Sequence, residues 1–197
     1  MKETFIREQL FYGKELIPFL AASVVMIGVG VVLGFLSPLH APKVASQVSA
    51  PVAEFVNKFV DLPKPYLALA IFFNNVLKTL LVIVLGTLWG LVPVVFLAVN
   101  GYALGLVLYL SIKSRGVWVS LLAIAPHGLF ELPGVLLGTS IGLMLGVRAL
   151  KRMFRKTETT ASGELKRALG FFFVVIVPLL LIAAFVEAFI TTAGVSR

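Results

Sequence analysis

Residues 126–134 of the chain read PHGLFELPG, inside sequence that is otherwise strongly apolar. The stretch places an imidazole, His127, and a carboxylate, Glu131, at a depth where ionisable side chains are costly in a membrane and usually functional. It also places two prolines and two glycines where a helix would have to be continuous. Irregular backbone at that depth is tolerated only where it is buried in protein or faces water. We therefore expect a broken or re-entrant segment here, beside a candidate site.

The composition of the whole chain indicates its class. Of the 197 residues, 59% are hydrophobic and only 13% are charged, and the mean hydropathy is +1.04. The long apolar runs are typical of membrane helices, and they lack the alternation expected of barrel strands. We predict an all-α, polytopic transmembrane helical bundle. The chain has no cysteine, which excludes disulfides and thiolate metal sites.

The apolar runs predict about five spans within a single integral membrane domain, residues 1–197. The predicted spans are residues 17–37, 66–90, 91–112, 129–150 and 168–192. Residues 1–16 predict a short interfacial helix, and residues 51–61 predict an amphipathic helix on the outer side. Residues 117–125 are apolar but too short to cross a bilayer, so we interpret them as a half-helix before span 4.

The distribution of basic residues predicts the orientation. With the N-terminus inside and five spans, ten of the 17 Lys and Arg residues lie on the cytoplasmic side and six on the outer side. Seven of the ten lie between spans 4 and 5. The positive-inside rule then favours a multi-pass protein of the cell (plasma) membrane with a cytoplasmic N-terminus. The net charge of +8 clusters beside the spans, which favours anionic lipid headgroups over nucleic acid as its partner.

This orientation brings the polar residues of several spans into the outer half of the bilayer. We expect them to form a ligand site or polar pocket that opens outward, made of Asn74, Asn75, Lys78, Asn100, His127, Glu131 and Glu187. The competing interpretation is structural. Asparagines commonly join membrane helices by hydrogen bonds, and a buried lysine needs a carboxylate partner.

Three of these residues could ligate a metal. His127 and Glu131 are four residues apart and share a face if the backbone is helical, and Glu187 could be the third ligand. Imidazole and carboxylate are zinc ligands, so zinc is the cofactor that this set would take. The spacing differs from H-E-x-x-H, and the chain has neither a P-loop nor a nucleophile elbow. We therefore assign no catalytic residue.

Glycines recur every four residues along span 4, at Gly134, Gly138, Gly142 and Gly146. Spans 2 and 3 carry the same spacing at residues 86–90 and 101–105. Small residues at this spacing let helices approach closely. They serve either packing within the chain or association of two copies, and a homodimer through these glycine-rich helices is the partner that we expect.

The pattern of residues 126–133, with the Asn74-Asn75 pair and the Asn100-Gly101-x-x-x-Gly105 run, resembles the stage II sporulation protein M family. The resemblance covers about residues 66–150, and Gly134 stands where family members often have alanine. It implies a multi-span integral membrane protein. In spore-formers such a protein resembles a membrane scaffold that organises peptidoglycan-degrading partners during engulfment.

Three functions are compatible with these features. The first is a non-enzymatic scaffold or membrane-remodelling component, which would work with other membrane or envelope proteins. The second is a small transporter or permease component, because broken helices beside buried charges are typical of such sites. The third is an intramembrane zinc-dependent hydrolase that uses His127, Glu131 and Glu187.

Overall fold

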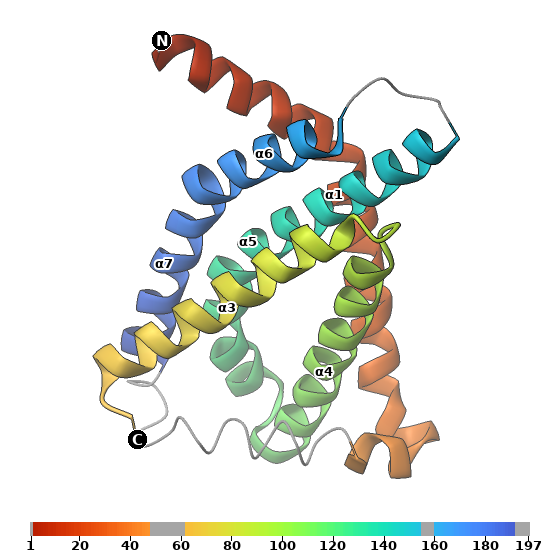
Figure 1. Cartoon of the computed structure of the whole chain (residues 1–197). Helices are drawn as coiled ribbons and strands as arrows, with labels where there is room; N and C mark the ends of the chain where they lie inside the picture. Colours follow the sequence, from red (N-terminus) through yellow and green to blue (C-terminus); the bar gives the residue numbers. More distant parts are fainter. Residues whose placement is uncertain (1, 48–61, 155–159, 192–197) are drawn as a thin grey trace.

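The computed structural model describes residues 2–47, 62–154 and 160–191, and in these residues every regular element is helical. Four long helices come before the last rod: α1 (Lys2–His40), α3 (Lys64–Gly86), α4 (Leu91–Arg115) and α5 (Val117–Met153). A fifth rod runs without interruption through α6 (Ala161–Phe171), the π-helical turn η1 (Phe172–Ile176), α7 (Val177–Val186) and the π-helical turn η2 (Glu187–Thr191). Five helices in the described residues are long and apolar enough to cross a membrane, which confirms the all-α polytopic bundle (Figure 1).

The helix ends extend beyond several of the predicted spans. The predicted interfacial helix and span 1 form one helix, α1, which includes Pro18 and Pro38. Its N-terminal part bends away from the remainder, as a proline inside a helix allows (Figure 1). The last rod starts seven residues before predicted span 5, because the Thr160 hydroxyl accepts a hydrogen bond from the backbone N–H of Gly163 and caps α6. The amphipathic helix predicted at residues 51–61 lies outside the described residues.

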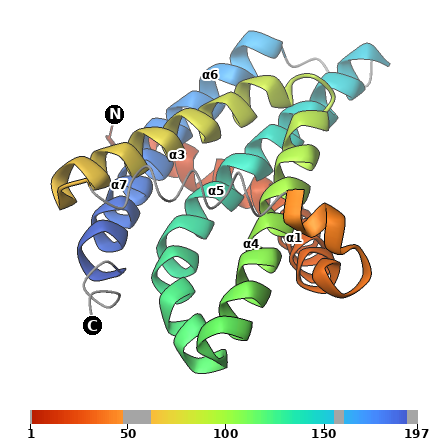
Figure 2. The same cartoon turned by 90° about the horizontal axis from the view of Figure 1, so that it is seen from below.

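The predicted break in the helix at residues 126–134 is wrong, because the backbone there is continuous helix. The structure has one helix, α5, from Val117 to Met153, and the helix is bent rather than interrupted (Figures 1 and 2). A proline removes one N–H donor and pushes its ring against the preceding turn, which is enough to bend a helix. Membrane helices tolerate this because neighbouring groups and small local adjustments compensate for the lost hydrogen bond.

Helix α5 is the centre of the bundle. It packs against α1, α3, α4, α6 and α7 (Figure 2). About half of the most apolar stretch of α5 is buried, against a third or less in the other four spanning helices. The other helices turn large apolar side chains outward, among them Val29, Phe73, Val95 and Phe185, each about half exposed. Such a surface suits hydrocarbon rather than water as its surroundings.

Close contact between α1 and α4 depends on glycine. A Cβ atom on Gly34 would lie 2.0 Å from the carbonyl oxygen of Tyr102, and one on Gly105 would lie 2.0 Å from the carbonyl oxygen of Val31. Gly101 is similarly confined, 2.5 Å from the carbonyl oxygen of Ile27. The two backbones therefore touch, and no larger residue fits between them without separating the helices.

The glycine stripe of α5 makes a second set of close contacts, all within the chain. A Cβ atom on Gly138 would lie 2.1 Å from the methyl group of Thr79, and one on Gly142 would lie 2.7 Å from the carbonyl oxygen of Val82. Gly146 faces Gly90 in the turn between α3 and α4, where Gly90 has a φ of +75° that suits glycine. The stripe thus serves intrachain packing, one of the two roles that its spacing allowed, and by itself it indicates no second copy.

The ends of the helices fall into two groups. The N-terminal part of α1, the α3–α4 turn, the end of α5 and the start of α6 lie at one end of the bundle (Figure 1). The end of α1, the start of α3 and the α4–α5 turn at Gly116 lie at the other. We call these the N-terminal end and the opposite end.

Candidate functional site: polar groups within the bundle

The segments that carry most of the predicted polar residues do pack together. Helix α3 carries Asn74, Asn75 and Lys78, α5 carries Glu131, and η2 begins at Glu187. The η2 turn packs against both α3 and α5. The change from α-helical to π-helical hydrogen bonding starts at Glu187, and π-helical turns occur frequently at functional sites.

The side chains on these segments differ in burial. Asn75 is buried, and its side-chain Oδ1 accepts a hydrogen bond of 3.2 Å from the side-chain Nδ2 of Asn74. Lys78 is exposed, and Glu131 and Glu187 are half-buried. None of these three charged groups lacks an interaction partner. The two asparagines therefore form a hydrogen-bonded polar pair on α3, which is otherwise mostly apolar.

The predicted zinc ligands are only partly described. His127 lies in α5, but its side chain is outside the described residues, as are the side chains of residues 123–130. Among the side chains that the structure does describe, no three His, Cys, Asp or Glu residues lie close enough to hold a metal ion. The set of His127, Glu131 and Glu187 stays a prediction.

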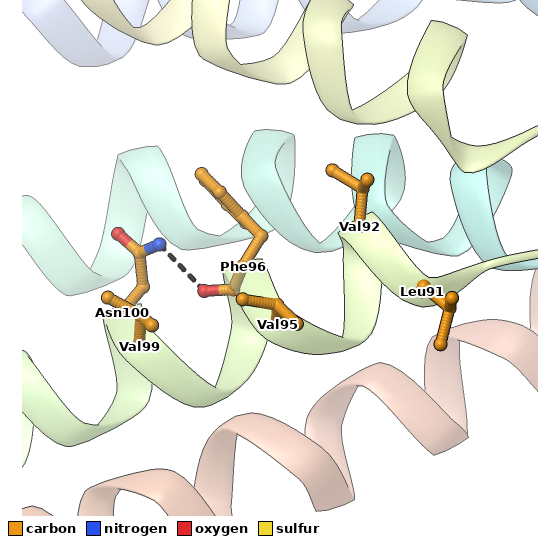
Figure 3. Close-up of a pocket in the computed structure, with 6 residues that line it drawn as sticks. All are labelled: Leu91, Val92, Val95, Phe96, Val99 and Asn100. Carbon is orange, nitrogen blue, oxygen red and sulfur yellow. Dashed lines mark hydrogen bonds between the residues drawn. The ribbon is translucent and has the colours of Figure 1, made fainter. Parts of the chain in front are cut away.

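Asn100 interacts within its own helix. Its amide nitrogen donates a 2.7 Å hydrogen bond to the carbonyl oxygen of Phe96 (Figure 3). The side chain is exposed and lies at one end of a shallow groove of α4, whose other lining residues are Leu91, Val92, Val95, Phe96 and Val99. The groove offers one amide and otherwise hydrocarbon, so it suits apolar contacts better than a polar ligand.

A cluster of buried hydroxyl groups joins α1 to α5. The Ser23 hydroxyl lies 3.2 Å from that of Ser140, and the Thr139 hydroxyl lies 3.5 Å from Ser23. All three side chains are buried. Thr139 and Ser140 also donate to carbonyl oxygens one turn earlier in α5, so both remain bonded without Ser23. This cluster was not predicted, because serine and threonine in a membrane helix give no signal of their partner.

A larger polar site, also not predicted, lies at the N-terminal end. Glu15 of α1 accepts a 2.7 Å bond from Arg148 of α5 and lies 3.7 Å from Arg167 of α6. Glu164 of α6 is almost fully buried and lies 3.6 Å from Arg148. Arg152 donates a further short hydrogen bond to Glu164. Two carboxylates and three guanidinium groups thus tie three helices together.

The surroundings of this network exclude water on one side. Tyr12 is buried, its ring centroid lies 5.4 Å from that of Phe171 with the two rings tilted, and the Arg167 guanidinium lies 5.2 Å from the Tyr12 centroid. The Tyr12 hydroxyl and the side-chain Oε1 of Gln9 are buried without a hydrogen-bond partner in the described part of the chain. Ion pairs at the edge of such a core are screened less than pairs in open water. We therefore infer that the network stabilises the packing of α1, α5 and α6 and is more than a surface contact.

The sequence contained a partial signal for this network. Thr160 has the character of a helix N-cap, and a helix that begins there carries Glu164 in its first turn and Arg167 one turn later. The pairing of Glu15 with Arg148 joins residues 133 positions apart, so no local pattern predicts it.

Comparison with known proteins agrees with the resemblance seen in the sequence. The model of the family described as stage II sporulation protein M matches residues 23–192. The match begins inside α1 and extends just past η2, so it includes part or all of each of the five spanning helices. No curated protein and no solved structure matches the chain. The chain therefore belongs to the stage II sporulation protein M family, as a multi-pass membrane protein.

Proposed function

We propose that the protein is a non-enzymatic scaffold or membrane-remodelling component. The observation that carries this proposal is the way α5 holds the bundle together. It contacts the other four spanning helices, and its glycines bring its backbone into close contact with α3. The glycine contacts between α1 and α4 confine the remaining pair in the same way. A rigid unit with an exposed apolar surface suits a protein that positions other membrane proteins.

The transporter alternative has less support from this packing. Transporters alternate by rocking one group of helices against another around a central site. In this bundle α5 contacts all the other spanning helices, so rocking one group of helices against another would have to break the glycine contacts of α5. No specific feature of the described residues favours the hydrolase alternative.

The proposal includes a setting and partners. We propose that the protein lies in the plasma membrane with its N-terminus in the cytoplasm, since this puts seven cationic residues between the last two spans inside. We also propose that it forms homodimers. The glycines are occupied within one chain, so two copies would have to meet through outward apolar faces. Other membrane or envelope proteins would use the same faces.

A polar pocket in the outer half of the bundle is the second part of the proposal. Its support is that α3, α5 and η2, which carry Asn75, Glu131 and Glu187, pack against one another. Zinc held with His127 is the cofactor that this set of ligands would suit. Elemental analysis of the purified protein tests it. Equal zinc content in the wild type and the His127→Ala variant would count against the metal.

Photocrosslinking tests the scaffold. A photoreactive residue at Val29, Phe73 or Phe185, which all face outward, should give discrete adducts with membrane or envelope proteins and with a second copy. The control is Ile141, which is fully buried and should give no intermolecular adduct. A scaffold should give these adducts, and proteoliposomes that contain the protein should show no solute flux. Measurable flux without adducts would favour the transporter and reject the scaffold.

A further inference from the structure

The acidic groups at the N-terminal end point inward. Glu15 and Glu164 are the acids at this end whose side chains the structure describes, and both are engaged by arginines. Glu164 is 3% exposed, so it contributes almost nothing to the outer surface. The pairing neutralises these two carboxylates from within, and among the side chains that the structure describes the nearby surface carries cations.

The described lysines at the same end lie on the surface. Lys14, Lys151 and Lys166 are exposed, and each is next to or near a member of the network on α1, α5 or α6. Arg167 is only partly used by Glu15, with 47% of its side chain exposed. We call these four residues the cationic collar. Three helices contribute to it, and the ion pairs hold those helices in place.

The position of the collar along the membrane-spanning helices indicates what kind of molecule it contacts. Lys14, Lys151 and Lys166 all lie within the helical segments that are apolar enough to span a bilayer, near their ends. Large apolar side chains stand among them, including Phe11 at 61% exposure and Phe154 at 63%. Side chains of this kind need hydrocarbon contact, so the adjacent ammonium groups lie at the depth of lipid headgroups. A soluble acidic protein would not account for the exposed aromatic rings.

We propose that the cationic collar binds the phosphate groups of anionic phospholipids. The lysines supply charge, and Arg167 supplies a planar fork of donors that matches phosphate oxygens. The acyl chains of the same lipids would cover Phe11 and Phe154. This inference concerns lipid recognition alone and does not depend on the scaffold role.

Lipid binding can be measured on the intact protein in detergent. Native mass spectrometry would count phosphatidylglycerol and phosphatidylcholine molecules retained by the wild type and by the triple variant Lys14→Ala, Lys151→Ala, Lys166→Ala. Each lysine near an anionic surface contributes about fivefold in affinity, so the triple variant should lose tenfold or more of its preference for phosphatidylglycerol. Phosphatidylcholine binding should change little.

The opposite end provides a matched control. Lys43, Lys64 and Lys113 are exposed there, and their triple alanine variant removes the same charge and the same side chains. This variant should keep the preference for phosphatidylglycerol. Equal losses in both triple variants, or no loss in either, would overturn the collar. Displacement of the lipid by excess inorganic phosphate would also overturn it, because the site would then recognise free phosphate.

Discussion

Replacing Gly105 by alanine puts one methyl group into the contact between α1 and α4. The added Cβ would lie 2.0 Å from the carbonyl oxygen of Val31 and 2.8 Å from the backbone nitrogen of Phe35. Ordinary contacts of a Cβ atom begin near 3.4 Å. The obstructing atoms belong to the backbone and cannot rotate away, so the helices would have to separate by more than about 1 Å in a closely packed interior.

The expected cost follows from two opposing effects. Overpacking a core by a methyl group costs about 1–3 kcal/mol, and a clash with backbone belongs at the upper end. Alanine recovers about 0.5–1 kcal/mol over glycine within a helix. We therefore expect Gly105→Ala to lower the free energy of unfolding by about 2 kcal/mol, and Gly34→Ala to behave alike because it meets the carbonyl oxygen of Tyr102 at 2.0 Å.

The matched control is Gly28→Ala, one turn from the same contact. No atom lies within 4 Å of its Cβ position, so only the helix preference should act and the protein should gain about 0.5–1 kcal/mol. Unfolding by sodium dodecyl sulfate in mixed micelles, followed by the fluorescence of Trp89 and Trp118, measures all three variants. Equal stability of Gly105→Ala and Gly28→Ala would refute the glycine contact. A loss that grows on dilution would instead place the contact between two copies.

Three further predictions concern topology and polar contacts. Cysteines introduced at Thr159 and Ser46 should react with impermeant reagents from opposite sides of the membrane, and labelling from one side would contradict the five-span arrangement. Glu164→Gln should destabilise the protein by about 2–3 kcal/mol, because it removes the carboxylate that Arg148 and Arg152 share beside a buried core. Unfolding in mixed micelles measures this loss, and a loss smaller than that of Glu15→Gln would contradict the prediction. Ser23→Ala should cost only about 0.6 kcal/mol, the average for hydrogen bonds between membrane helices, and a loss above about 2 kcal/mol would show that the hydroxyl cluster does more than join α1 to α5.

The sequence predicted the elements better than their contacts. Apolar runs of the right length identify spanning helices because lipid leaves the backbone few other structures, and the five spans followed from that constraint. Pro126 and Pro133 suggested a break because a proline disrupts helical hydrogen bonds. Whether the helix stops or bends depends on what packs around it, and α5 contacts helices from four other parts of the chain, α1, α3, α4 and the α6–η2 rod. That information is absent from the local sequence.

Glycine spacing shows the same limit. The stripe on α5 indicated close packing, which the structure contains, and it could not specify the partner. The partner turned out to be α3 of the same chain for Gly138, and both α3 and α4 for Gly142, which meets Val82 and Pro93. Gly30 and Gly34 of α1 were not recognised as a contact with α4, although they have the same four-residue spacing as Gly101 and Gly105.

The charged residues explain why a count of basic residues can predict orientation and still miss a site. The positive-inside rule treats Lys and Arg as equal and ignores acids, and on this basis the segment between the last two spans was only a cytoplasmic marker. The structure divides those of the cations that it describes into two groups. Arg148 and Arg152 turn inward to carboxylates, while Lys151 and Lys166 remain on the surface. Guanidinium groups suit the inward role because their donors are fixed in a plane and match carboxylate oxygens, whereas ammonium groups remain strongly hydrated and suit a headgroup surface. The choice of arginine or lysine at each position therefore carries information that a charge count discards.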